Sequence, residues 1–472
     1  MHNRIQFLIL WLTASPLTIG AQVNTAALPD APHLQLQMQM QHSAQGPTLP
    51  AAAPPSASSP AAAAGLALTR QQAEQLALKN NPRISVGDLL ARAQKEHVRV
   101  TRSAEFPTLN GALTGVDAEE GSRLSTGSLS ASRLLYHVGG GVELDQLITD
   151  FGHTRNLVAS SSFQAKASDQ QAAATRDDII LSVDLAFYNA LEAQATLQVA
   201  KSTVKARQAV GDQVDALTAS KLKSTLDQSF AQVNLSQAKL LNLDAQNQYD
   251  AAMANLNEIL GSTNDDQYQL IDDPTPPEPI ATSAEGVITL ALQQRPDLLA
   301  LKSTHESDVR FARAERDQLL PTISGLGDVG YTPVGSNEYF ITKWYGAAGV
   351  NIGIPIFNGF KYHSEATEAD FRAKASDEQS RGLIDRIVRD VRTAWLKAQT
   401  AQQRVAVTAE LLKEANTALD LADTRYRLGL SSIVELSQAQ LQQTQAQIDD
   451  ANARFDYEAD IAALRFQSGS QP

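Results

Sequence analysis

The chain offers no combination of side chains that matches a known catalytic site. Its eight histidines are scattered without HExxH spacing, and it lacks the GxSxG, GxxxxGK[ST] and GxGxxG patterns. It has no cysteine, so we expect no disulfide, no thiolate metal site and no lipid-anchored cysteine. The glycines of VGGGVE at 138–143 suit strand curvature better than phosphate binding. We therefore expect no enzyme, no cofactor and no metal.

The composition indicates a folded protein that does not bind nucleic acid. The chain has 472 residues, of which 43% are hydrophobic, enough for a substantial core. Its formal charge of -13 is spread along the sequence, and no basic run could neutralise phosphates. Acidity of this kind indicates solubility more than any particular partner.

The N-terminal region has the pattern of an exported protein. Residues 1–21 place the basic Arg4 before a short apolar run and then small residues, as in a signal peptide. Residues 22–65 hold seven of the 19 prolines among Ala and Gln runs, which predicts a disordered leader. Beyond residue 21 no stretch reaches the roughly 18 apolar residues of a membrane helix. Any membrane crossing must then be made by strands.

The rest of the chain is an internal duplication. FQAKASDQQ at 163–171 returns as FRAKASDEQ at 371–379, and this block aligns without gaps at a spacing of 208 residues. An earlier block, 73–109 with 287–323, aligns at a spacing of 214. We predict repeats at 66–272 and 284–472, separated by a Pro-rich linker at 273–283.

Each repeat has the pattern of very long helices. No proline occurs from 108 to 273 or from 356 to 471. Apolar and small residues recur at steps of three or four, which predicts a heptad seam and a helix from about 154 to 220. The predicted seam comprises Ile180, Val183, Phe187, Ala190, Gln194 and Leu197, and in the second repeat Val388, Val391, Trp395, Ala398, Gln402 and Val405.

Each repeat also has one predicted β-hairpin, at about 108–149 and 322–357. Alternate residues from Trp344 to Ile356, including Ile354, share one strand face, and Ile148 shares a face with Leu144. The aromatic residues near the second loop fit a girdle at a lipid boundary: Tyr331, Tyr339, Phe340, Trp344 and Tyr345. A soluble sandwich edge is the alternative. Four strands cannot close on themselves, so lipid-facing strands require several chains.

These features together resemble the TolC-type outer-membrane efflux proteins. The resemblance covers about 66–470, and its marks are LALKNNP (76–82), LALQQRP (290–296), FPTL (106–109), LPTI (320–323), LITDFGHTRN (147–156), IPIFNGF (354–360) and RYRLGLSSIVEL (425–436). It implies a mainly α fold with a transmembrane β part. Long antiparallel helices would form a periplasmic α-barrel, and four strands per chain would enter a 12-stranded barrel of a homotrimer. It also implies a periplasmic adaptor protein, an inner-membrane pump and contact with outer-membrane lipid.

The resemblance also implies a gate at the periplasmic tip. Gly429 marks the turn, Glu435 stands where the family often has a pore carboxylate, and Tyr426 with Asp227 matches a hydrogen-bonded pair that holds the tip shut. Two departures are Ser431, at a position for a latch arginine, and Gln438, at a position for a second carboxylate. Arg425 and Arg427 are close enough in sequence to replace the latch. Alternatively, Glu435 and Asp227 are ordinary solvated helix positions.

The expected function is an exit duct for small toxic compounds. Type I protein secretion and cation efflux are alternatives, because a duct need not recognise its cargo. A periplasmic coiled-coil scaffold is an alternative of a different class, and it would need neither lipid nor detergent.

Overall fold

The structure is a computed structural model that describes residues 66–117, 136–262, 268–272, 280–331 and 344–469. The expected signal peptide and leader, most of both hairpin loops, Tyr339 and Phe340 lie outside the described residues. Of the predicted linker at 273–283, the structure describes residues 280–283.

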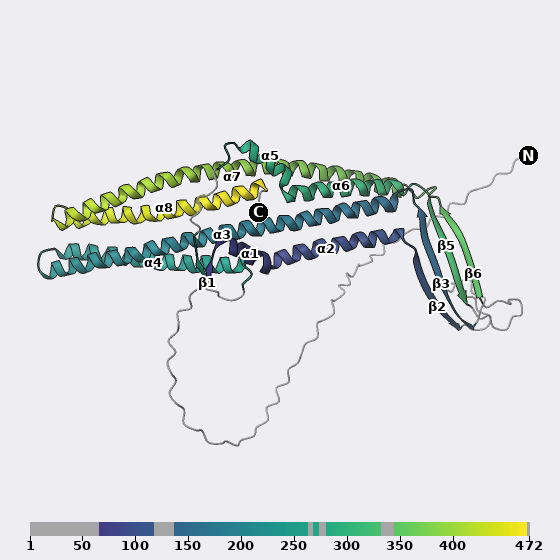
Figure 1. The fold of residues 1–472 in the computed structure, drawn as a ribbon, viewed down its shortest axis with the longest axis horizontal. Helices are drawn as coiled ribbons and strands as arrows, with labels where there is room; N and C mark the ends of the chain where they lie inside the picture. Colours follow the sequence, from purple (N-terminus) through teal and green to yellow (C-terminus); the bar gives the residue numbers. More distant parts are fainter. Residues whose placement is uncertain (1–65, 118–135, 263–267, 273–279, 332–343, 470–472) are drawn as a thin grey trace, which may run out of the picture. The chain divides into compact units, whose positions relative to one another are not determined.

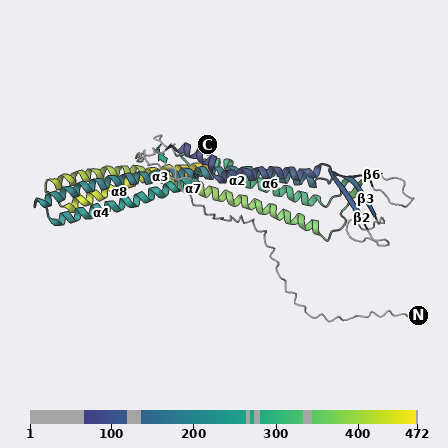
Figure 2. The ribbon, with the colours of Figure 1, turned by 90° about the horizontal axis from the view of Figure 1, so that it is seen from below.

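Two helices of 67 residues each, α3 (His153–Ala219) and α7 (Lys361–Arg427), are the longest of the described elements. Each turns back into a partner, α4 (Thr225–Ile259) or α8 (Ile433–Ser468), that packs along it (Figures 1 and 2). The prediction of a helix from about 154 to 220 is confirmed, and at about 1.5 Å per residue it extends roughly 100 Å. None of the described helices has a stretch long and apolar enough to cross a membrane.

Alanine recurs at every seventh position along the buried seams of these helix pairs. The buried series is Ala231, Ala238, Ala245 and Ala252 in α4, and Ala394, Ala401, Ala415 and Ala422 in α7, with Thr408 completing the heptad. Small side chains at this spacing let antiparallel helices approach closely. The α7 seam passes through Ala401, so the prediction that Gln402 lies on it is wrong; Gln402 is exposed.

The four predicted strands pair antiparallel in the order β2-β3-β5-β6. Their bounds are β2 Thr108–Asp117, β3 Tyr136–Thr149, β5 Thr322–Tyr331 and β6 Trp344–Gly353. The predicted extension of the last strand to Ile354 and Ile356 is wrong, because Pro355 has no amide hydrogen to continue the ladder. A register shift between Leu147 and Thr149 interrupts strand alternation at Ile148, so alternation does not fix its face.

The first and last strands of this sheet are open edges. β2 and β6 each pair with one neighbour over ten residues, and the described chain supplies no strand to their outer sides. Apolar side chains on them are exposed, Leu113 by 84% and Val350 by 65%. The described part of the chain thus leaves two rows of backbone donors and acceptors without strand partners.

Two shorter helices meet at a kink in each repeat. α1 (Arg70–Asn80) and α2 (Pro82–Arg102) meet at Asn81, and α5 (Ala284–Gln294) and α6 (Pro296–Asp317) meet at Arg295. Proline at the first helical position starts the new helix, because it lacks the amide hydrogen that would extend the old one. Two short strands, β1 (Leu66–Leu68) and β4 (Tyr268–Leu270), pair in parallel.

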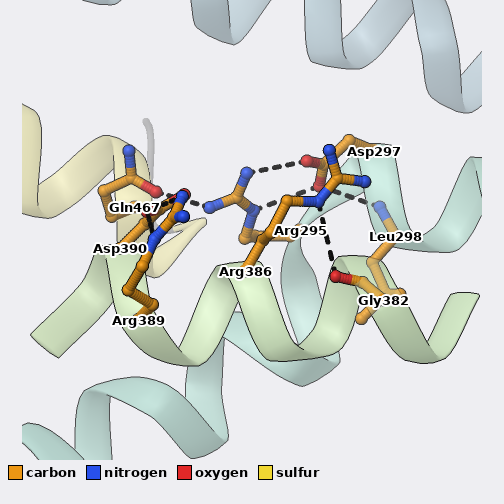
Figure 3. Close-up of polar contacts among 8 residues, drawn as sticks. All are labelled: Arg295, Asp297, Leu298, Gly382, Arg386, Arg389, Asp390 and Gln467. Carbon is orange, nitrogen blue, oxygen red and sulfur yellow. Dashed lines mark hydrogen bonds and ion pairs between the residues drawn. The ribbon is translucent and has the colours of Figure 1, made fainter.

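Each kink binds the C-terminal end of the last helix in its own repeat. The side-chain amide of Asn81 donates to the carbonyl of Ile259 at 2.9 Å. In the second repeat Arg295 donates to Gln467 at 2.6 Å and to the two carboxylate oxygens of Asp297 at 3.1 and 2.7 Å (Figure 3). The same junction is therefore held by a neutral amide in one repeat and by a charged guanidinium in the other.

A glycine follows the last helix at both junctions. Gly261 and Gly469 have φ of +72° and +71°, where a side chain is strained. A Cβ on Gly261 would lie 2.8 Å from the carbonyl oxygen of Asn80, and a Cβ on Gly469 would lie 3.0 Å from the amide nitrogen of Arg295. Both glycines are required by conformation and by the close approach of the kink.

Two carboxyl groups and an arginine meet where α1 packs on α3. Asp184 is 3% exposed, Arg70 lies 3.4 Å from it, and Arg70 also pairs with Glu74. Burial, and then hydrogen bonding to and charge repulsion by Glu74, raise the pKa of Asp184 to about 7 although Arg70 opposes the shift. Burial also raises the pKa of Tyr188, which faces the same cluster. A proton on this carboxyl pair therefore stabilises the docking of α1.

Gly261→Ala should lower the free energy of unfolding by about 1–3 kcal/mol, through backbone strain and the contact with Asn80. Helical circular dichroism during denaturant unfolding measures it. Gly286→Ala is the matched control, because a Cβ at Gly286 in α5 meets open space and alanine favours helix. Equal losses in both variants would show that the Asn80 contact is unimportant.

Asp184 should make the protein less stable as pH rises from about 4 to about 7. Its folded pKa exceeds its unfolded value, so the folded state binds more protons in this window and its contribution to stability is lost as pH rises. We expect the stability of Asp184→Asn relative to wild type to improve across the same window. A difference that does not change with pH would contradict the raised pKa.

Candidate functional site

The two long helical hairpins turn beside one another, at the place where Gly429 predicts a turn. The turns occupy residues 220–224 and 428–432. An apolar cluster joins them, formed by Val214, Ala231, Tyr426, Ile433 and Leu436. The side-chain amide of Asn234 in α4 also donates to the hydroxyl of Ser437 in α8 at 2.7 Å. The tip is thus one packed unit, and the Asn234 contact had no signal in the sequence.

Both long helices end in the same hydrogen-bonded cap. Gly429 has φ of +75° and donates to Tyr426, while Leu430 donates to the carbonyl of Arg425 at 2.8 Å. The other turn forms the same two bonds around Lys221, with φ of +60°. Lys221 is therefore a side-chain-bearing residue at a position that favours glycine.

The second helix of each hairpin begins at a serine cap, followed by an acid three residues later. Ser224 and Ser432 accept hydrogen bonds from the amides of Asp227 and Glu435. The Asp227 carboxylate also accepts from the amide of Ser224 at 3.2 Å, which completes a capping box. No such return bond is formed by Glu435. The Ser-x-x-acid spacing was a sequence signal for these caps.

Tyr426 and Asp227 lie near one another without forming the expected hydrogen bond. The Tyr426 side chain is 4% exposed, and its hydroxyl has no hydrogen-bond partner among the described residues. Burial first, and then the charge of Asp227, raise the pKa of Tyr426. Lys223 lies 4.1 Å from the centre of its ring. Within one chain, Tyr426 is thus a core residue and Asp227 a helix cap.

The two arginines have different partners. Arg425 lies 3.4 Å from Glu435 across the turn, with side-chain exposures of 55% and 43%. Arg427 pairs with Asp423 one turn earlier in its own helix, at 2.7 Å. Exposed pairs of this kind contribute at most about 1 kcal/mol. Arg425 therefore forms an ion pair with the predicted pore carboxylate, Glu435, whereas Arg427 forms one inside its own helix, α7.

The two departures from the family pattern also have distinct surroundings. The hydroxyl of Ser431 is buried and has no hydrogen-bond partner among the described residues. Gln438 is exposed on α8, one turn from Glu435. Of the two positions where the family pattern has pore carboxylates, position 435 therefore carries an acid, with Arg425 beside it, and position 438 carries a neutral amide.

The described aromatic residues of the predicted girdle gather at the far ends of β5 and β6. Tyr331 and Trp344 pair across these strands, with ring centres 5.2 Å apart. Trp344 and Tyr345 are 69% and 50% exposed. The Tyr345 side chain lies over Gly330, where a Cβ would come within 2.6 Å of its hydroxyl oxygen and of two ring carbons. Glycine here makes room for an aromatic ring across the sheet.

Lys221→Gly should raise the free energy of unfolding by about 0.5–1 kcal/mol, because glycine removes the strain of positive φ. Denaturant unfolding followed by helical circular dichroism measures the change. The repeat supplies the control: Gly429→Ala should lower stability by a similar amount. A loss of stability in Lys221→Gly would show that the lysine side chain outweighs the strain.

Known proteins are similar to this chain in sequence and in fold. The sequence model of the outer membrane efflux protein family matches residues 73–262 and 287–470, once in each repeat. Outer membrane protein OprJ of Pseudomonas aeruginosa is 26% identical over 374 residues, which are 77% of this chain and 76% of OprJ. Outer membrane protein TolC of Vibrio cholerae is 24% identical over 423 residues, 84% of this chain and 89% of TolC.

A solved structure has the same architecture. A crystal structure of CusC superposes with a TM-score of 0.74 at 18% sequence identity, covering 86% of this chain and 93% of that chain. At this identity the likeness shows the fold alone. The two family matches together span most of the sequence and both repeats. The chain belongs to the outer membrane efflux protein family.

Proposed function

We propose that three copies of the chain form the outer-membrane exit channel of a tripartite efflux system for small toxic compounds. The family supports an efflux channel in the outer membrane. The observation that carries the trimer is the four-stranded sheet with two open edges. In hydrocarbon each unpaired backbone group costs several kcal/mol, so β2 of one copy must pair with β6 of the next. Three sheets then close a 12-stranded barrel.

The long helices form the duct that continues from this barrel into the periplasm. Their alanine seams hold the two helices of each hairpin close together within the chain. The hairpins of several copies, side by side, would surround a common pore. The tip exposes four leucines by 63–71%: Leu222, Leu226, Leu428 and Leu430. Exposed apolar patches of this kind mark contact surfaces. They support docking of a periplasmic adaptor protein, which in turn joins an inner-membrane pump.

Glu435 is the proposed selectivity residue of the closed tip. Three copies would place three Glu435 carboxylates around one axis, and a ring of negative charge favours cations. Arg425, 3.4 Å from Glu435, offsets part of that charge. The two residues should therefore act on ion preference in opposite directions.

Single-channel currents in planar bilayers test this proposal. Glu435→Gln should lower the preference for cations over anions, and Arg425→Ala should raise it. Glu410→Gln is the control, because Glu410 lies far along α7 in an exposed pair with Lys413. Unchanged ion preference in both tip variants would remove Glu435 from the gate. A protein that dissolves without detergent and conducts nothing would instead be a periplasmic scaffold.

A further inference from the structure

The two faces of the four-stranded sheet differ in chemistry. Directly paired residues of neighbouring strands share a face, so the register assigns each strand residue to one of the two. One face, the apolar face, carries exposed large side chains, among them Leu113, Val142, Leu144, Val329, Trp344 and Val350. The opposite face, the polar face, consists mainly of Gly, Ala, Ser, Thr, Asn, Asp and Glu. In the proposed barrel the apolar face contacts lipid, so the polar face lines the pore.

Tyr345 lies on the polar face, although Trp344 and Tyr331 beside it lie on the apolar face. Consecutive strand residues point to opposite faces, and Tyr345 follows Trp344 directly in β6. Tyr345 pairs with Gly330 of β5, which pairs in turn with Gly141 of β3. The hydroxyl oxygen of Tyr345 lies 2.3 and 2.7 Å from where a Cβ would stand on Gly330 and Gly141. The tyrosine side chain therefore extends across β5 towards β3.

Two glycines let the tyrosine ring lie against the backbone of the sheet. Any side chain at Gly330 would collide with the ring, because a Cβ there would lie 2.4 and 2.6 Å from two of its carbons. Gly330 is buried, whereas Tyr345 is 50% exposed. One side of the ring is thus covered by the sheet and the other is open. The negative π-face of an aromatic ring is therefore presented to the pore.

Two acidic side chains lie on the same face, two residues closer to the helices. Glu143 of β3 pairs directly with Asp328 of β5, in the row next to Gly141 and Gly330. At about 3.4 Å per residue, this row lies about 7 Å from that of Tyr345. Both acids are exposed, and neither forms an ion pair within the described residues. Like charges directly opposite one another destabilise a sheet, so fold stability does not account for this pair.

We infer that Tyr345, Glu143 and Asp328 form a binding site for organic cations, such as quaternary ammonium compounds, on the pore side of the sheet. The open π-face attracts a cation, and the carboxylates add charge attraction. The apolar groups of an organic cation can contact the ring, which favours it over a small hydrated ion. This inference places Tyr345 in the pore rather than at the lipid boundary.

The inferred site deepens the proposed function, on which it rests. Tyr345 lies at the loop end of β6, which is the end away from the helices in chain order. In the proposed channel the helices lie in the periplasm, so the loop ends of the strands open to the outside. The channel would therefore contact cationic cargo at its exit, remote from the carboxylate of Glu435 at the tip.

Cysteine modification tests which face Tyr345 occupies, because the natural chain has no cysteine. Tyr345→Cys and Tyr331→Cys channels in planar bilayers are treated with a positively charged, membrane-impermeant methanethiosulfonate, and mass spectrometry measures labelling. We expect the conductance for cations to fall in Tyr345→Cys, because the label adds positive charge inside the pore. Tyr331→Cys is the matched control at the same strand end, on the apolar face, and its conductance should not change. Absent labelling of Tyr345→Cys, or the same conductance response in both variants, would overturn the pore position.

Block of the current by tetrabutylammonium, added to one side of the bilayer at a time, tests the ligand. From the loop side, Tyr345→Leu should require about tenfold more tetrabutylammonium for half block than wild type. Tyr345→Phe keeps the aromatic face and should retain the block, which also checks that the barrel tolerates substitution here. Glu143→Gln should weaken the block, and Tyr331→Leu should leave it unchanged.

The outcomes separate this site from the proposed function. Channels that conduct normally, but are blocked equally in wild type and Tyr345→Leu, overturn the site and leave the channel standing. Equal weakening in Tyr331→Leu and Tyr345→Leu overturns it as well. A protein that forms no channel in bilayers overturns the proposed function, and the site with it.

Discussion

Backbone hydrogen bonding at the edges of the sheet constrains how the chain can assemble in a membrane. β2 and β6 each have one side without a strand in the described chain, and lipid offers no hydrogen-bond partners. Water could satisfy these groups in a soluble protein, but in an outer membrane efflux protein only other strands can. Because the four described strands of one chain cannot close on themselves, the need to pair the outer backbone groups of β2 and β6 becomes a need for several chains.

Duplication gives the chain the same set of elements twice, in both its helical and its β part. Each repeat supplies a β-hairpin, a kinked helix pair and a long helical hairpin. The two repeats have diverged where their side chains have different roles. At the tip Asp227 completes a helix cap, while its counterpart Glu435 faces Arg425. At the turn Lys221 keeps a conformation that Gly429 adopts without strain.

Most of the fold was predictable because it rests on local rules. The absence of proline and the heptad spacing located α3, and alternation located the strands. The prediction was wrong where one residue or the packing of neighbouring helices determines the local structure. Pro355 ends β6, and Ala401, not Gln402, lies on the buried seam of α7. The tip was predictable in position only. Sequence spacing does not show that Asp227 would bond to its own cap, or that Asp184 would be buried beside Glu74.

Electron cryomicroscopy of the protein in a lipid nanodisc would show directly how the outer strands of the sheet are paired. We expect three chains around one axis, with the backbone of β2 (Thr108–Asp117) in one chain paired to β6 (Trp344–Gly353) of the next. A single chain whose outer strands remain unpaired in the bilayer, or pair with each other, would contradict it.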